Sequence, residues 1–324
     1  MRSVVEDTGL GRIILLKNNP DWNWFSMAQE GLEHCPSKCT IINSFENFNI
    51  NFASAVIFYA TNYPKDLPIK KVGQVWIYFT LESPYFSQDT QFRNIEWRDK
   101  INWTMTYRRD SDIWYPYGRV STRDSPANID YLPAARNKTK QVAWFVSHCT
   151  TPSRRQNYVK ELRKYISVDT YGACGDLRCL PEGSTKCFDM LSRHYKFYLS
   201  FESAFCRDYV TEKVFEFVLK ADIVPVVRGG ADYSKYLPPK SYINTADFPS
   251  ARHLGEYLSF LDSNDAAYSE YLQWKNHYYV QEKPIPICEI CVKLTEPKSY
   301  ANVYKDVFSW WHRDVCVAPN RTLS

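Results

Sequence analysis

The chain has 324 residues, which is enough for two ordinary domains or one large one. Hydrophobic residues make up 44% of the chain, so extensive cores are possible, and the formal net charge is only +4. Because basic and acidic residues are interspersed, the sequence lacks the dense basic face that nucleic-acid-binding proteins carry. We therefore expect no nucleic-acid partner, whereas a diphosphate ligand is compatible with this charge.

Short apolar and β-branched runs alternate with helical patterns along the chain, which indicates an α/β architecture. The predicted strands, in chain order, are Ala55–Tyr59, Val75–Leu81, Asn102–Tyr107, Val142–Ser147, Ser167–Tyr171, Lys196–Phe201 and Ile223–Val227. The predicted helices are Arg154–Tyr165, Thr211–Ala221, Ala251–Ser263, Ala266–Tyr278 and Tyr300–Trp311. Continuous apolar strand sequences such as VAWFV are typical of parallel strands that are buried on both faces.

A polar stretch that contains Pro126 and Pro133 interrupts these patterns. We interpret it as a linker and predict four parts: an N-terminal lobe at 1–126, the linker at 127–141, a C-terminal lobe at 142–299, and a helix with a tail at 300–324. Two Rossmann-like lobes that face each other would leave a ligand cleft at the carboxyl ends of their strands.

The chain contains ten cysteines, of which four form two close pairs, Cys35 with Cys39 and Cys288 with Cys291. An even number of cysteines favours disulfides in a protein of the secretory pathway. A four-thiolate zinc site made from both close pairs is the alternative, against which their wide separation and unequal spacing count. The connectivity of any disulfides does not follow from the sequence.

Three sequons, at Asn102, Asn137 and Asn320, permit a lumenal location. No apolar run approaches the about 18–20 residues of a membrane span. No secretory signal opens the sequence either. We therefore expect a membrane association only through an N-terminal anchor that this sequence does not contain.

The segment 195–232 carries the strongest functional signal. It reads as a buried strand, a polar loop and a helix that begins near Thr211. A helix N-terminus attracts phosphate through its free N–H groups and its dipole. Lys213 adds positive charge there, and the carboxylate of Glu212 suits a ribose diol. Ordinary helix-start electrostatics is the alternative interpretation of the same residues.

The same segment continues into a second buried strand that ends in Gly229-Gly230. Such a turn lets the backbone approach a ligand closely, and loops after strands are usual ligand positions in α/β folds. The chain has neither the G-x-x-x-x-G-K-[ST] phosphate loop nor the G-x-G-x-x-G fingerprint. This speaks against an ATPase and against a nicotinamide-dependent dehydrogenase.

Several sequence blocks between about residues 74 and 291 follow one another at a recognisable spacing. In chain order they are LESP at 81–84, NWTMTYRRDSDI with PYG at 102–118, Arg155 with Tyr158 and Glu161-Leu162, YKFYLSFE at 195–202, RDYVTEK at 207–213, VPVV at 224–227, SYIN at 241–244 and DFPS at 247–250. This ordered set resembles the α-1,3-fucosyltransferase family.

The resemblance implies a GT-B type fold of two facing Rossmann-like lobes, GDP-fucose as the donor, and inversion at the transferred sugar carbon. Glu82 would be the general base that takes the proton of the acceptor hydroxyl. Arg155 and Lys213 would neutralise the diphosphate of the leaving group. The family also implies a Golgi lumen location for a single-pass type II membrane protein, and a disulfide-bonded C-x-x-C like Cys288–Cys291.

By the same resemblance, Glu212 would hold the ribose of the donor and Tyr209 lies in the same donor-binding block. Glu202, Ser203 and Tyr117 complete the predicted set of donor-binding residues. The expected partners are GDP-fucose and an N-glycan or lactosamine acceptor. No cofactor and no metal ion are expected.

The sequence departs from the family at two places. The family's Phe-Glu-Asn-Ser is here FESA at 201–204, and its Ser-Asn after the strand at 142–146 is here Ser147-His148. These changes keep open an alternative, a donor- or glycan-binding relative with weak or no transferase activity. His148 is interpreted as a loop histidine whose hydrogen bonds are satisfied, the alternative being a contact to phosphate or base.

Asp110 and Asp112 have the D-x-D pattern that holds Mn²⁺ in other glycosyltransferases. Two carboxylates one residue apart can share a cation. However, Arg108 and Arg109 are adjacent and can neutralise them, and the resembling family uses no such metal centre. We therefore expect that Mn²⁺ is not required.

The acceptor would be chosen by loops of the N-terminal lobe such as 83–98, which contains Tyr85, Phe86, Phe92 and Trp97. The tolerated acceptors are the inner GlcNAc of an N-glycan core and the GlcNAc of a lactosamine antenna. The cysteine-rich segment with Cys174, Cys179 and Cys187, together with Cys206, resembles the branch of the family that acts on the N-glycan core.

Overall fold

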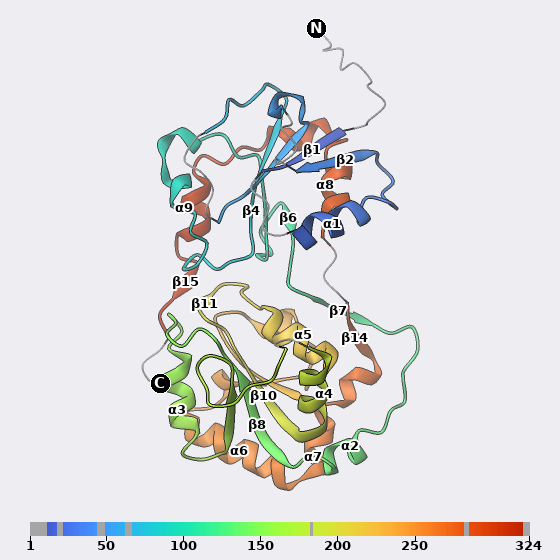
Figure 1. Ribbon diagram of the computed structural model, residues 1–324, viewed down its shortest axis with the longest axis vertical. Coiled ribbons are helices and arrows are strands. Elements are labelled where there is room, and N and C mark those ends of the chain that lie inside the picture. The colour runs from blue at the N-terminus through green and yellow to red at the C-terminus, as the bar shows by residue number, and fades with distance from the viewer. Residues whose placement is uncertain are drawn as a thin grey trace. The chain divides into compact units, whose positions relative to one another are not determined.

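The computed structural model describes residues 12–17, 22–43, 49–61, 67–181, 184–281 and 285–319. Contacts between residues divide the chain into two compact units (Figure 1). Unit 1 comprises Met1–Pro116 and Pro284–Val315, and unit 2 comprises Tyr117–Lys283 and Cys316–Ser324. The chain therefore leaves unit 1, forms most of unit 2, and returns to unit 1 before it ends in unit 2.

This division differs from the predicted boundaries. The predicted linker, 127–141, lies within unit 2, where it forms helix α2 (Leu132–Arg136) and the start of strand β8 (Lys140–Phe145). Tyr131 and Ala135 of that stretch are buried in the core of unit 2. Residues 284–315, predicted as the end of the second lobe and a separate tail, belong to unit 1 instead. Pro126 lies in an exposed stretch, and Pro133 lies in the first turn of α2. Neither marks a boundary between domains.

In the described residues, unit 1 is built on a six-stranded parallel sheet with the order β2-β1-β3-β4-β5-β6. Its strands are β1 (Arg12–Lys17), β2 (Cys39–Asn43), β3 (Ala55–Tyr59), β4 (Val75–Thr80), β5 (Trp103–Thr106) and β6 (Ile113–Trp114). β3 and β4 are the central strands, and every residue of β4 is buried. This burial explains the continuous apolar sequence VWIYFT, since parallel strands are covered on both faces.

Different elements cover the two faces of the unit 1 sheet. Helices α1 (Trp22–Glu30) and α8 (Ile287–Lys293) share one core with residues of β1 to β5. The opposite face holds an aromatic cluster in which Trp97 contacts Phe58, Trp76 and Phe92. Helix α9 (Val307–His312) adds Trp311 to this face, against Tyr78. Many of the chain's aromatic side chains thus serve packing.

Unit 2 is built on a five-stranded parallel sheet with the order β13-β12-β10-β8-β9, within the described residues. Besides β8, its strands are β9 (Val168–Tyr171), β10 (Tyr195–Phe201), β12 (Val224–Arg228) and β13 (Ile243–Asn244). Every residue of β10 and of β12 is buried. Two short antiparallel pairs complete the unit, β7 (Arg119–Thr122) with β14 (Tyr278–Gln281) and β11 (Phe205–Cys206) with β15 (Cys316–Val317).

The helices of unit 2 lie on both faces of its sheet (Figure 1). One core joins Val142 and Trp144 of β8 to α3 (Arg155–Leu162), α6 (Ala251–Ser263) and α7 (Asp265–Glu270). The other core joins Ala143 of the same strand to α4 (Thr185–His194). Side chains alternate between the faces of a strand, so neighbouring residues of β8 serve opposite cores. Helix α5 (Glu212–Lys220) follows β10 and leads into β12.

The seven predicted strands all exist, with ends shifted by at most two residues, and the α/β class is confirmed. The helix predicted at Tyr300–Trp311 is wrong in its first half, because η8 (Pro297–Ala301) is a short 3₁₀ turn and α9 starts only at Val307. The helix predicted at Ala266–Tyr278 is divided into α7 and the 3₁₀ turn η7 (Gln273–Asn276).

The ten cysteines form five disulfides, and none is free. The two close pairs meet in unit 1, where Cys35 bonds Cys288 and Cys39 bonds Cys291. These bonds attach α8 to the β2 edge of the sheet, so the C-x-x-C belongs to unit 1 and not to the second lobe. The zinc-site alternative is wrong, although its four cysteines do come together in space. The remaining bonds lie in unit 2: Cys149–Cys174, Cys179–Cys187 and Cys206–Cys316.

None of the helices in the described part of the chain combines the length and the apolarity that crossing a membrane requires. Of the three sequons, Asn102 is 5% exposed, and its side-chain amide donates to the carbonyl oxygens of Tyr300 and Asn302. It is therefore a packing residue. Asn137 is exposed after α2, and Asn320 lies outside the described residues.

Candidate functional site

The carboxyl ends of three neighbouring strands gather the predicted donor residues of unit 2. β8, β10 and β12 are adjacent and parallel, so the segments that follow Phe145, Phe201 and Arg228 lie at one edge of the sheet. This edge is where α/β folds bind ligands. Glu202 directly follows β10, and Arg155 begins α3 after the loop that follows β8.

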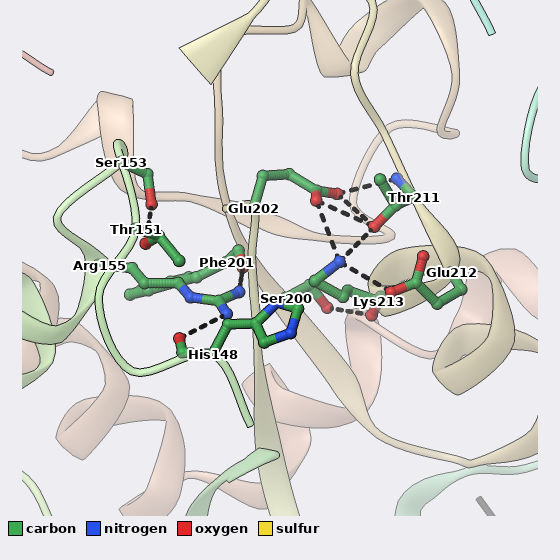
Figure 2. Close-up of polar contacts among 10 residues, drawn as sticks. All are labelled: His148, Thr151, Ser153, Arg155, Ser200, Phe201, Glu202, Thr211, Glu212 and Lys213. Carbon is green, nitrogen blue, oxygen red and sulfur yellow. Dashed lines mark hydrogen bonds and ion pairs between the residues drawn. The ribbon is translucent and has the colours of Figure 1, made fainter. Parts of the chain in front are cut away.

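Glu202 is the centre of a hydrogen-bonded network at the start of α5 (Figure 2). Its side chain is completely buried, and its Oε1 accepts from the backbone N–H of Thr211 at 2.8 Å. The hydroxyl of Thr211 lies 2.9 and 3.0 Å from the two carboxylate oxygens. Lys213 Nζ lies 3.5 Å from the same carboxylate and 2.9 Å from the Thr211 hydroxyl. Glu202 therefore holds the helix start in place and faces protein donors.

Burial and charge act in opposite directions in this network. Burial raises the pKa of Glu202, while the charge of Lys213 and the hydrogen bonds from Thr211 lower it only in part. For Lys213, burial lowers the pKa, but the carboxylates of Glu202 and Glu212 outweigh it and leave the pKa above its ordinary value. Lys213 thus stays a cation, held at the N-terminal turn of α5 as the sequence predicted.

Glu212 is the most accessible carboxylate of this group. Its side chain is 48% exposed, and one oxygen accepts from Lys213 Nζ at 2.7 Å. Burial raises the pKa of Glu212, but the charge and hydrogen bond of Lys213 more than compensate and leave the pKa lowered. An ionised, half-exposed carboxylate has lone pairs left for hydroxyl donors.

Arg155 connects the ends of β8 and β10. Its guanidinium is buried and donates to the Phe201 carbonyl at 2.7 Å and to the His148 carbonyl at 3.2 Å (Figure 2). Among the described residues, its Nε atom is buried without a hydrogen-bond partner. Burial lowers the pKa of Arg155, and Glu202 offsets part of this effect. The predicted cation is present, and it also fixes two loops of the site.

Sequence reasoning missed a second buried arginine, Arg228, at the end of β12. It lies between the rings of Tyr158 and Phe205, 4.8 and 4.6 Å from their centroids, and donates to the Ser153 carbonyl at 2.9 Å. Burial lowers the pKa of Arg228 to about 10. Ser153 in turn donates its N–H to the Ser203 carbonyl. The signal that the sequence offered for Arg228 was a charged residue at the end of an apolar strand.

Tyr117 and Tyr209 meet at the same helix start. Their ring centroids are 6.4 Å apart in an edge-on arrangement. Gly118 brings this segment against α5, because a Cβ at that position would lie 2.5 Å from the Phe215 ring. The structure therefore brings together the donor residues predicted from two distant blocks. Tyr209 is buried, whereas Tyr117 is partly exposed.

The Gly229-Gly230 turn packs against protein. A Cβ on Gly230 would lie 2.6 Å from the backbone of Phe205, and a Cβ on Gly229 would lie 2.5 Å from the hydroxyl of Tyr233. The predicted close approach is real, but in this structure its partner is the loop that carries Cys206. Asp232, at the end of the segment, is exposed and caps the 3₁₀ turn η5 (Tyr233–Lys235).

Of the residues that depart from the family, Ser203 and Ala204 are buried and His148 is exposed. Ser203 is 7% exposed and uses its carbonyl to accept from Ser153, while Ala204 is completely buried. His148 is exposed, and no protein partner of its imidazole is found in the described residues. The described residues therefore supply no protein partner for this loop histidine.

Glu82 lies in unit 1, where it follows β4 at the carboxyl end of that strand. Its backbone N–H donates to the Thr80 hydroxyl at 3.2 Å, and its side chain is partly exposed. The predicted strand-end position is confirmed.

Both carboxylates of the D-x-D pattern, Asp110 and Asp112, accept hydrogen bonds from other residues of the protein. Asp110 makes two hydrogen bonds with the guanidinium of Arg108, at 2.8 and 2.5 Å. Asp112 accepts from the backbone N–H of Thr104 at 2.9 Å and from the hydroxyl of Tyr304 at 2.8 Å. Both carboxylates stabilise the turn after β5.

Within the predicted acceptor loop 83–98, Phe92 and Trp97 are each 2% exposed and belong to the aromatic cluster of unit 1. They cannot contact a ligand in this conformation. Tyr85 is 51% exposed and remains available.

Comparison with known proteins identifies the family. Residues 135–310 match the model of the glycosyltransferase family 10 (fucosyltransferase) C-terminal region, and residues 12–118 match the fucosyltransferase N-terminal model. The glycoprotein 3-alpha-L-fucosyltransferase A of Drosophila melanogaster is 40% identical over 253 residues, which is 74% of this chain and 47% of that protein. The alpha-(1,3)-fucosyltransferase C of the same organism is 34% identical over 318 residues, 89% of this chain and 73% of that protein.

The fold is shared with a solved structure. A crystal structure of an alpha1,3-fucosyltransferase with GDP-fucose superposes with a TM-score of 0.51 at 17% identity, covering 90% of this chain and 91% of that one. This likeness confirms the predicted GT-B fold class. The chain spans about half the length of the first relative and about three quarters of the second. On the two family matches and these identities, the chain belongs to glycosyltransferase family 10, the fucosyltransferases.

Proposed function

We propose that this chain transfers fucose from GDP-fucose to the 3-hydroxyl of a GlcNAc residue, with inversion at the fucose anomeric carbon. The observation that carries the proposal is the pair of cations at the carboxyl edge of the unit 2 sheet, Arg155 and Lys213. A diphosphate leaving group needs this positive charge as its bond to fucose breaks. The relatives named above are α-1,3-fucosyltransferases, which supports the same activity here.

Several residues of unit 2 would hold GDP-fucose, with different residues at the diphosphate and at the ribose. Arg155 and Lys213 would face the diphosphate, and the half-exposed Glu212 would accept hydrogen bonds from the ribose hydroxyls. Tyr117 and Tyr209 would contact the donor near the helix start. Glu202 and Ser203, predicted as direct contacts, would act through the backbone they hold, because the Glu202 carboxylate accepts from Thr211 and the Ser203 carbonyl accepts from Ser153.

The chemical step is a single displacement. The acceptor O3 forms a bond to the fucose anomeric carbon while the bond from that carbon to the diphosphate oxygen breaks. Glu82 would take the proton of the acceptor hydroxyl, and GDP would leave with the electron pair. One attack on the face opposite the leaving group inverts the configuration.

We further propose that the reaction requires no Mn²⁺. The two D-x-D carboxylates are occupied by Arg108, Thr104 and Tyr304, so a metal ion would have to displace these partners. The cations of unit 2 can supply the charge instead. We place the enzyme in the Golgi lumen, since five disulfides suit an oxidising compartment of the secretory pathway.

The preferred acceptor is the N-glycan core, with lactosamine antennae as the second class. The name of the 40% identical relative, a glycoprotein 3-alpha-L-fucosyltransferase, supports this order. The test is to mix the protein with GDP-fucose and both acceptor classes, with and without excess chelator. We expect transfer that the chelator does not reduce. Tight GDP-fucose binding with no transfer to either class would show a binding relative instead of an enzyme.

A further inference from the structure

We propose that the imidazole of His148 is an additional contact to the donor diphosphate. The proposal rests on the proposed function, because it assumes that GDP-fucose occupies the carboxyl edge of the unit 2 sheet. It begins from a residue that departs from the family pattern and whose imidazole has no partner among the residues that the structure describes.

The backbone that carries His148 is held from both sides. Arg155 donates to the His148 carbonyl at 3.2 Å, and the next residue, Cys149, is disulfide-bonded to Cys174. The N–H of Cys174 donates to the carbonyl of Val146 at 3.1 Å. A loop fixed at 146, 148 and 149 presents its side chain in a defined place, which lowers the entropic cost of a ligand contact.

The imidazole of His148 is accessible to a ligand. The side chain is exposed, and within the described parts of the chain no hydrogen-bond or ion-pair partner is found for the ring. Figure 2 shows the ring extending from its loop, past the guanidinium of Arg155, toward the side of the site that holds Lys213. Glu202 and Glu212, the carboxylates of this site, accept from Thr211 and Lys213 and make no contact with the ring within the described residues.

The charge balance of the site leaves room for another donor. Lys213 lies between two carboxylates, 3.5 Å from Glu202 and 2.7 Å from Glu212, which largely neutralise it. Two guanidinium nitrogens of Arg155 donate to backbone carbonyls. A diphosphate has several oxygen acceptors, and an imidazole always offers at least one N–H donor. His148 is therefore suited to supply a hydrogen bond that the two predicted cations do not.

The test compares binding of GDP and of guanosine, which has the same base and ribose but no phosphate. His148→Ala removes the donor, and His148→Gln keeps an N–H at similar reach. The matched control is His194→Ala, since His194 is also exposed in unit 2 but ends α4 at the opposite edge of the sheet. Affinities are measured by calorimetry for GDP and by competition for guanosine.

We expect His148→Ala to weaken GDP binding about 10- to 150-fold, the usual effect of losing a hydrogen bond to a charged group. Guanosine binding should change less than about 2-fold, and His148→Gln should recover most of the loss. An unchanged affinity for GDP in His148→Ala, or an equal loss for GDP and guanosine, would overturn the proposal. If the unaltered protein binds no GDP, the proposed function itself fails.

Discussion

Replacing Lys213 by Met should make stability depend on pH through the buried carboxyl of Glu202. The change removes the charge 3.5 Å from Glu202 and keeps a side chain of similar length and helix propensity. Burial already raises the pKa of Glu202, and Lys213 is the main group that opposes this. A carboxyl whose pKa is higher in the folded state than its unfolded value of about 4.3 stabilises the folded state below that unfolded pKa. This stabilisation is lost as the pH rises through the folded-state pKa.

The expected cost follows from the burial of the two partners. Breaking a buried ion pair costs about 3–5 kcal/mol when the remaining charge has no other support. Here Lys213 is 21% exposed, and Thr211 still donates to the completely buried carboxylate, so we expect about 2 kcal/mol at pH 8. The loss should shrink at pH 5.5 because Glu202 can take up a proton. Urea unfolding at both pH values, monitored by circular dichroism, measures the difference.

The control is Lys235→Met. Lys235 pairs with Asp232 at 3.4 Å, but the two side chains are 59% and 55% exposed. Exposed pairs contribute less than about 1 kcal/mol, so this variant should change little at either pH. Equal destabilisation of Lys213→Met at pH 5.5 and 8, or none at both, would refute the reasoning about Glu202.

Three further outcomes follow from the same structure. Glu82→Gln should reduce turnover about 10²–10⁴-fold while the dissociation constant of GDP-fucose stays within a factor of two or so, as measured by single-turnover kinetics and calorimetry; a fully active variant would remove Glu82 from the mechanism. Replacing Cys206 and Cys316 by Ala should cost about 2–4 kcal/mol of unfolding free energy in urea, because their disulfide attaches the tail to the loop before α5; wild-type stability would contradict this. Tyr85→Ala should raise the acceptor KM without loss of stability, whereas Trp97→Ala should lower the thermal midpoint because it empties the aromatic cluster; the reverse pattern would contradict the assignment of the loop.

The strands were predictable because their signal is local. Segments such as 195–201 and 224–228 are apolar throughout, as parallel strands covered on both faces must be. The same signal existed for β1, whose sequence RIILLK was not recognised as a strand. The boundaries of the units were not predictable, since residues 284–315 join unit 1 through contacts with segments far away in the sequence.

The cysteine pairing shows why long-range contacts escape sequence reasoning. Cys35 and Cys288 are separated by 253 residues, and Cys39 and Cys291 by 252. Their separation argued against a shared zinc site, yet the fold places all four together. Spacing reports proximity only within one element or turn, and the return of the chain to unit 1 is a property of the whole fold.

The donor residues were found because they lie in short sequence blocks of a recognisable order, but their individual roles depend on burial. Glu202 reads as a loop carboxylate next to a helix start, and only the structure shows it buried beneath Thr211. Arg228 is one charge at the end of an apolar strand, and its position between two rings requires the packing of α3 and β11. The exposure of His148, which finds no partner for its ring in the described parts of the chain, also could not be seen in the sequence.

The most direct test of the account is the product formed on a trimmed N-glycan core. The protein is incubated with GDP-fucose and the core glycan in excess chelator, and the product is examined by mass spectrometry and by linkage analysis. The account predicts one added fucose on the 3-hydroxyl of the inner GlcNAc, formed by the unaltered protein and nearly absent with Glu82→Gln. Fucose at another position, or equal product from both proteins, would contradict it.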